Sequence, residues 1–162
     1  MIDKITPRPS EKIANELETA GLQDMQPVIT SKQTYIAPFV NAEGPQYLVI
    51  EDAFPNGRPE LEKAGVYLTD RDTVNKSERM KVTVCLNPIH SALGPYGCIL
   101  GYTLFSDEMK DEDMLKLAHL VGDEGMEVVP DPKILSPKAF LEECLYERFP
   151  NPYLGDTVPG HF

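Results

Sequence analysis

Residues 80–93 read Met-Lys-Val-Thr-Val-Cys-Leu-Asn-Pro-Ile-His-Ser-Ala-Leu, and this stretch decides how the rest of the chain is divided. Its first seven residues are rich in β-branched and apolar types, which favours a strand over 80–86. Asn87 and Pro88 then favour a helix start, with Asn87 as the N-cap and Pro88 at the first helical position. The stretch therefore predicts a strand that runs directly into a helix.

Weaker signals predict short strands before this stretch and helices after it. A helix is expected over 10–20, closed by Gly21, followed by strands over 34–37, 46–51 and 66–69. The helix that starts at Asn87 is expected to run toward Tyr102. Apolar residues at helical spacing predict further helices over 107–121 and 137–149, with a break from Gly122 onward. We therefore expect an α+β fold in which a mixed α/β part precedes a mostly α-helical part.

Three polar residues of the stretch could act together on one oxygen atom: Lys81, Asn87 and His90. Lys81 and Asn87 are six positions apart, so a regular strand would point both side chains to one face. Asn87 and His90 would share one side of the first helical turn, where free backbone N–H groups favour negative charge. A lysine with a lowered pKa can exchange a proton with an alcohol or carbonyl oxygen that the other two residues polarise. The ordinary alternative is a solvated lysine, a helix cap and a hydrogen-bonded histidine.

The composition argues against several other classes of function. The 162 residues include 15 basic and 26 acidic ones, and the formal net charge of -11 disfavours nucleic acid or anionic membrane as the main partner. No window is apolar enough for a membrane span, and residues 1–5 lack the apolar run of a signal peptide. Three cysteines without close pairs predict free thiols in a reducing cytoplasm. Cys85, His90 and Cys98 match no common zinc spacing, so no metal is expected.

Five segments of the chain resemble the long-chain mannitol dehydrogenase family, and they follow one another in the order of that family. Their ranges are 1–7, 47–52, 54–59, 80–93 and 148–157, which together span nearly the whole chain. The most specific of them is the Lys followed by Asn-x-x-His in the central stretch. Within the family, Cys85–Leu93 looks most like the branch that interconverts D-fructuronate and D-mannonate.

The resemblance implies a cytoplasmic oxidoreductase that uses NAD(H), with NADP as a second option, on a sugar acid or polyol and without a metal. By matching motif, Lys81 would be the general acid/base, and Asn87 and His90 would bind the reacting oxygen of the substrate. Asp3 would lie near both the nicotinamide and the substrate, and the alternative for Asp3 is a solvated terminal carboxylate. The second activity that the resemblance allows is that of a mannitol 2-dehydrogenase or a mannitol-1-phosphate 5-dehydrogenase.

Two departures from the family pattern bear on these assignments. In much of the family the Lys lies five residues before the Asn, whereas Lys81 lies six before Asn87, and Val82 takes the five-back position. A bulge in the expected strand would absorb the additional residue. The chain also lacks G-x-G-x-x-G, the phosphate-binding loop of Rossmann folds.

The second departure predicts that the chain is an internal fragment of the longer family pattern. Residues 1–79 would be the end of a nucleotide-binding domain whose Rossmann core is absent, and residues 80–162 the truncated start of a helical substrate and catalytic domain. A function of another class follows from the same departure. The chain would then be a catalytically inactive remnant, or a piece that docks on another subunit and self-associates through exposed apolar surface.

Overall fold

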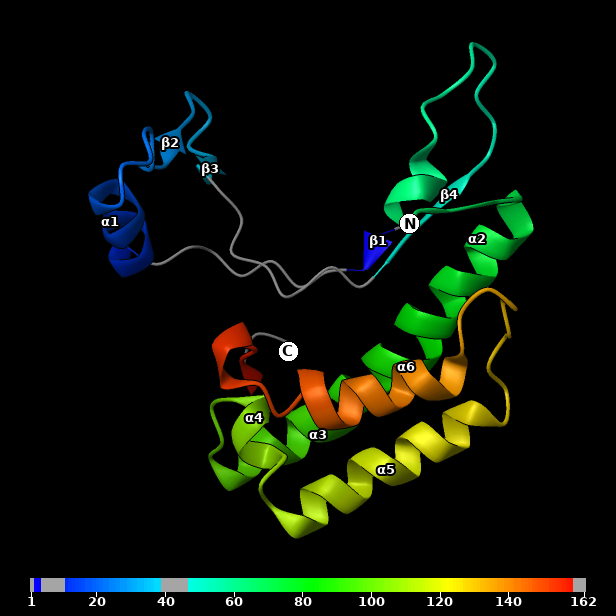
Figure 1. Ribbon diagram of the computed structural model, residues 1–162. Coiled ribbons are helices and arrows are strands. Elements are labelled where there is room, and N and C mark those ends of the chain that lie inside the picture. Colours follow the sequence, from blue (N-terminus) through cyan, green and yellow to red (C-terminus); the bar gives the residue numbers. More distant parts are fainter. Residues whose placement is uncertain (1, 4–10, 39–46, 159–162) are drawn as a thin grey trace. The chain divides into compact units, whose positions relative to one another are not determined.

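The computed structural model describes residues 2–3, 11–38 and 47–158, and the chain divides into two compact units (Figure 1). The smaller unit lies within residues 4–46. It contains helix α1 (Glu11–Thr19) and the antiparallel strands β2 (Val28–Ile29) and β3 (Tyr35–Ile36). Gly21 ends the helix as expected, with a φ of 96° that suits glycine. Residue 10, the expected first residue of this helix, lies outside the described residues.

The larger unit contains residues 1–3 and 47–162, and its strands form one small sheet. The strands are β1 (Ile2–Asp3), β4 (Tyr47–Glu51) and β5 (Tyr67–Thr69), in the order β1-β4-β5. β1 is antiparallel to β4, and β5 is parallel to it. A short 3-10 helix, η1 (Leu61–Ala64), precedes β5. The strands expected over 46–51 and 66–69 are confirmed.

Helices make up the rest of the larger unit. They are α2 (Arg71–Glu78), the π-helix η2 (Arg79–Leu86), α3 (Asn87–Leu100), α4 (Phe105–Glu108), α5 (Glu112–Met126), α6 (Pro137–Glu143), the π-helix η3 (Cys144–Arg148) and the 3-10 helix η4 (Pro152–Leu154). α3, α5 and α6 lie alongside one another and share the main apolar core (Figure 1). Strands thus precede a mostly helical part, and the expected α+β fold class is confirmed.

The expected strand over 80–86 is wrong. Helices α2, η2 and α3 form one continuous helix from residue 71 to 100, and residues 79–86 are its π-helical part. The fully buried apolar residues of its core face are Met80, Cys85, Ile89 and Leu93, five residues apart across the π segment and four apart in α3. Packing of this face overrides the β-forming tendency of the valines and threonine between them.

The same continuous helix crosses the domain boundary that the sequence predicts between residues 79 and 80. The proposed division into residues 1–79 and 80–162 stays a prediction.

The expected helix over 107–121 is divided in two. Asp111 is the N-cap of α5, and its carboxylate accepts hydrogen bonds from the backbone N–H groups of Asp113 and Met114. Residues 109–111 therefore separate α4 from α5. An aspartate with another acidic residue shortly after it is a helix-start signal, and this signal outweighs the apolar spacing that continues across it.

Two glycines of α5 serve packing and do not end the helix where a break was expected. A Cβ at Gly122 would lie 2.8 Å from Cδ1 of Leu141, and a Cβ at Gly125 would lie 3.3 Å from the carbonyl oxygen of Val84. α5 continues through both glycines to Met126. The absence of side chains lets α5 approach α6 and the π segment η2 closely.

Candidate active site

Lys81 is a buried cation enclosed by aromatic rings. It projects from η2 and is 1% exposed. Its Nζ lies 4.5 Å from the ring centroid of Tyr47, on β4, and 4.8 Å from that of Phe140, on α6. Ring faces attract a cation, so both contacts stabilise the charged amine. Lys81 is therefore not a solvated surface lysine, and its role as an acid/base stays a prediction.

Burial nevertheless dominates the proton affinity of Lys81. Burial and, to a smaller extent, the nearby Arg148 lower the pKa of the amine, Cys144 and Glu143 act in the opposite direction, and the result is a pKa of about 7. Near neutral pH, both protonation states of this amine are populated. That property is what a general acid/base requires.

His90 is held from three sides. Its Nε2 lies 2.8 Å from Oδ2 of Asp156, and its ring contacts Phe105 and Phe149 at centroid distances of 4.9 Å and 4.7 Å. A carboxylate only accepts hydrogen bonds, so Nε2 carries a proton and donates a hydrogen bond to Asp156. The imidazole, 7% exposed, is thereby fixed in both orientation and tautomer.

Asn87 is exposed and lies inside the continuous helix. Its φ of -63° and ψ of -36° are helical, and its backbone N–H donates to the carbonyl of Val82. The prediction that Asn87 caps a helix is therefore wrong, and no open helix terminus offers N–H groups at this point. The preceding π turn supplies hydrogen-bond partners for backbone N–H groups that a helix start at Pro88 would have left without one.

The π segment decides how Lys81 and His90 face. In a regular α-helix each residue turns by about 100°, so two residues nine positions apart lie on opposite sides. A π turn closes from residue i to i+5 and takes in one residue more than an α turn. Both side chains consequently face α6 and η3, where Lys81 lies on Phe140 and His90 lies on Phe149.

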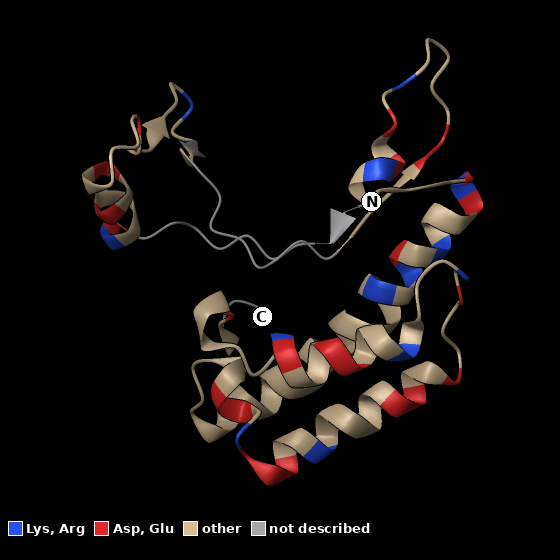
Figure 2. Cartoon of the chain, in the orientation of Figure 1, with Lys and Arg blue, Asp and Glu red and all other residues tan. Residues whose placement is uncertain are grey.

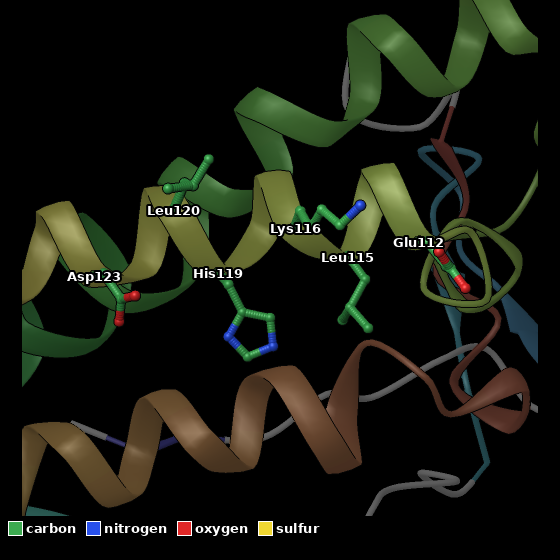
Figure 3. A pocket seen from close by; sticks show the side chains of 6 residues that line it. All are labelled: Glu112, Leu115, Lys116, His119, Leu120 and Asp123. Carbon is green, nitrogen blue, oxygen red and sulfur yellow. The ribbon is translucent and has the colours of Figure 1, made fainter.

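An open groove on α5 is a second candidate site, with a volume of about 550 Å³ (Figure 3). Its lining residues are Glu112, Leu115, Lys116, His119, Leu120 and Asp123. All of them come from a single helix, whereas binding sites usually gather polar groups from several elements. The region around Lys81 and His90, built from η2, α3, α6, η3 and β4, is the better candidate.

The sequence of this region matches the model of a known protein family. Residues 73–159, more than half of the chain, match the family model of the mannitol dehydrogenase C-terminal domain. The chain belongs to the mannitol dehydrogenase family. The resemblance drawn from the sequence motifs is thus confirmed, and the matched range includes Lys81, Asn87 and His90.

Individual members of the mannitol dehydrogenase family share much of this sequence. The chain is 60% identical over 159 residues to D-mannonate oxidoreductase of Thermotoga maritima, a match that covers 97% of this chain and 30% of that protein. It is 34% identical over 165 residues to mannitol 2-dehydrogenase of Neosartorya fischeri, covering 98% of this chain and 30% of that protein. The chain therefore spans about 30% of the length of these relatives.

Two solved structures have a similar fold. D-sorbitol dehydrogenase in substrate-free form has a TM-score of 0.72 and 30% identity, and the match covers 98% of this chain and 30% of that one. Pseudomonas fluorescens mannitol 2-dehydrogenase, in a ternary complex with NAD and D-mannitol, has a TM-score of 0.65 and 26% identity, with 99% of this chain and 30% of that one covered.

The step of six residues from Lys81 to Asn87, one longer than in much of the mannitol dehydrogenase family, runs through the π segment. An α-helical Lys-to-Asn step of five residues and a π-helical step of six turn through similar angles, because each π turn takes in one more residue. The additional residue between Lys81 and Asn87 is absorbed in this helix and not, as expected, by a bulge in a strand.

Four residues around the site were not assigned from the sequence: Tyr47, Phe140, Arg148 and Asp156. Arg148 and Asp156 belong to the segment 148–157 that resembles the family, but nothing in that segment indicates which earlier residues it contacts. Tyr47 and Phe140 have the ordinary pattern of a strand and of a helix core. Only the tertiary arrangement brings them to Lys81 and His90.

Asp3 is placed by its backbone alone. It pairs with Tyr47 across β1 and β4, and its side chain lies outside the described residues. Over residues 11–38 and 47–158, no three His, Cys, Asp or Glu side chains gather as metal ligands would, and no helix has the length and apolarity to cross a bilayer. Acidic and basic residues occur together along several helices (Figure 2).

Proposed function

We propose that this chain provides the oxygen-binding and proton-transfer part of a cytoplasmic, NAD(H)-dependent oxidoreductase that interconverts D-fructuronate and D-mannonate. The observation that carries the proposal is the burial of the Lys81 amine between the rings of Tyr47 and Phe140, which lowers its pKa to about 7. The 60% identity to a D-mannonate oxidoreductase supports the choice of substrate.

Three side chains of the continuous helix have roles in this mechanism. Lys81 gives a proton to the ketone oxygen of D-fructuronate during reduction and takes a proton from the alcohol in the reverse direction. The Asn87 amide donates a hydrogen bond to that oxygen. His90, whose Nε2–H donates to Asp156, offers Nδ1 as an acceptor for the hydroxyl form of the same oxygen. Hydride exchange at carbon is the chemistry that the nicotinamide supplies when bound. The mechanism needs no metal, because protonated Lys81 itself neutralises charge on the oxygen.

The residues of this chain fit the proton side of the reaction and do not form a complete cofactor site. The sequence lacks a glycine-rich phosphate loop, and the chain spans about 30% of the length of its relatives. Asp3 is the residue that we place near the nicotinamide. Its strand partner Tyr47 covers the amine of Lys81, which supports a position of Asp3 close to the reacting atoms.

The test is the NADH-dependent reduction of D-fructuronate by the protein that carries this sequence. The rate is measured as the decrease in NADH absorbance. Lys81→Met should lower kcat/KM by about 100- to 10,000-fold, the usual contribution of a general acid/base. Lys76→Met is the matched control, since Lys76 lies one turn earlier, is exposed and pairs with Asp72. Full turnover by Lys81→Met would overturn the proposal.

A second activity of the same class is favoured by the 34% identity to mannitol 2-dehydrogenase. D-fructose and D-fructuronate, offered separately with NADH, decide between the two substrates. A higher kcat/KM for D-fructose would assign the chain to mannitol oxidation. Fructose 6-phosphate, as a third substrate, tests the mannitol-1-phosphate dehydrogenase alternative.

A docking function is favoured by one surface of α3. Tyr96, Ile99 and Leu100 are 55%, 82% and 61% exposed, an apolar group at the end of the helix. Titration of the 162-residue chain with NADH, together with sedimentation, separates docking from catalysis. Self-association with no NADH binding up to millimolar concentration would favour the inactive remnant or subunit-docking alternative.

A further inference from the structure

Two cationic side chains are buried side by side around one aromatic ring. Lys81 and Arg148 are 1% and 4% exposed. The Nζ atom of Lys81 lies 4.8 Å from the ring centroid of Phe140, and Cζ of Arg148 lies 5.7 Å from the same centroid. The two cations come from different π-helices, η2 and η3, so the fold and not local sequence brings them together.

Arg148 is the member of this pair whose charge is fixed. A guanidinium keeps its proton at any physiological pH, whereas a lysine amine can lose its proton when it is buried. Each time Lys81 is protonated, two positive charges therefore share the space around Phe140. Repulsion between like charges favours the neutral amine, as it does for catalytic lysines that lie beside a second cation.

Among the described residues, Glu143 on α6, Cys144 on η3 and Tyr47 on β4 also act on the amine of Lys81. Glu143 and Cys144 favour the protonated amine and so oppose Arg148, and burial acts in the same direction as Arg148. The face of Tyr47 also favours the protonated form. Some groups around Lys81 thus favour the protonated amine and others favour the neutral amine. Changing one of these charges should move the proton affinity of Lys81 in a known direction.

We propose that Arg148 is a positioning residue that sets the proton exchange of Lys81 across the ring of Phe140. The role rests on the proposed function, because it matters for catalysis only if Lys81 is the acid/base. Arg148 contacts neither substrate nor cofactor in this account and acts through Lys81 alone.

The test follows the titration of Lys81 in the 162-residue chain. The ¹³Cε signal of ¹³C-lysine-labelled protein is recorded against pH, and the Lys81 signal is assigned by its loss in Lys81→Met. Arg148→Met removes the charge and keeps the apolar length, and it should raise the midpoint by about one pH unit, a tenfold change in the proton affinity. Arg148→Lys keeps the charge and should leave the midpoint near that of the wild type.

Two further variants control the experiment. Arg79→Met makes the same charge change at an exposed position two residues from Lys81 and should leave the midpoint unchanged. Arg148→Gln replaces Arg148→Met if the latter does not fold. A midpoint that is the same in Arg148→Met or Arg148→Gln as in the wild type would overturn the inference, as would an equal shift in Arg148→Lys.

The outcome is distinguishable from failure of the proposed function. If Arg148→Met shifts the titration of Lys81 but Lys81→Met retains turnover, the coupling stands and the catalytic role falls. If Lys81→Met abolishes turnover but Arg148→Met leaves the titration unchanged, the role of Arg148 alone falls. In an active enzyme, the limb of the kcat/KM–pH profile that Lys81 controls should shift in Arg148→Met and not in Arg148→Lys.

Discussion

The π segment η2 and the second half of α3 belong to one continuous helix, yet they hold buried ionisable groups in different ways. Lys81 projects from η2 into an enclosure of two aromatic rings with charged groups nearby. Glu108, from α4, lies against the bare backbone of Gly97 in α3, where a Cβ would overlap its Oε1. Both side chains are fully buried, and both have a pKa of about 7.

The causes of these similar pKa values differ. Burial alone raises the pKa of Glu108, whereas burial and the charge of Arg148 together lower that of Lys81. A group that is shifted only by burial responds to packing. A group that is also shifted by a neighbouring charge can be adjusted through that charge without repacking the core. The comparison therefore assigns Glu108 to the structure of the helix contact and Lys81 to the candidate chemistry.

The largest expected effect comes from deleting one exposed residue from the continuous helix, in one variant from α3 and in another from η2. Deletion of Ser91 should rotate the rest of α3 by about 100°, move Leu93 out of the core and lower the free energy of unfolding by more than about 4 kcal/mol. Deletion of Thr83 should convert the π turn to an α turn and cost less than about 2 kcal/mol. Urea unfolding followed by circular dichroism measures both, and equal losses would contradict the role assigned to the π turn.

Replacement of Lys81 tests the cost of burying an amine. The pKa of Lys81 is about 7 in the folded chain against 10.5 for an ordinary lysine. Between these values the unfolded chain binds more protons, so the free energy of unfolding rises with pH across this window. Lys81→Met should therefore stabilise the chain by up to about 4 kcal/mol near pH 6, and the gain should shrink toward pH 10. Urea titrations measure the free energy of unfolding over this pH range. A gain that did not change with pH would contradict the prediction.

Replacement of Glu108 should give the opposite pH dependence. Its pKa is about 7 in the folded chain against the ordinary 4.5, so between these values the folded chain binds more protons and loses stability as pH rises. Glu108→Gln cannot ionise, and it should be more stable than the wild type by roughly 1–3 kcal/mol above pH 7 and equal to it near pH 4. The matched control is Glu112→Gln, the same change at an exposed position of α5.

The sequence predicts most elements of this chain where local pattern and tertiary packing agree. The α+β class and the strands β4 and β5 are examples. It fails at residues 79–86, because the β-branched run Val82–Val84 favours a strand locally while the core face needs a helix. Lys81 was selected from a motif, and its catalytic role stays a prediction. The π turn that directs both Lys81 and His90 toward α6 and η3 could not be read from that motif. Phe140 and Arg148 could not be found, because Phe140 contacts Lys81 from about sixty residues away in the sequence and Arg148 lies over the same ring.

The smallest expected effect concerns His90, which lies on the same helix between the two compared regions and has the carboxylate of Asp156 at its ring nitrogen. Asp156→Asn can keep an acceptor for Nε2–H but loses the charge, and it should cost about 1 kcal/mol of the free energy of unfolding. Asp156→Leu removes the acceptor, so ¹⁵N NMR of the imidazole should show the Nε2–H tautomer in the wild type and a mixture in this variant. A single unchanged tautomer in Asp156→Leu would mean that packing against Phe105 and Phe149, and not Asp156, fixes the ring. In that case packing would set His90 as it sets Glu108, and Lys81 would be the one of these three side chains whose proton affinity a neighbouring charge adjusts.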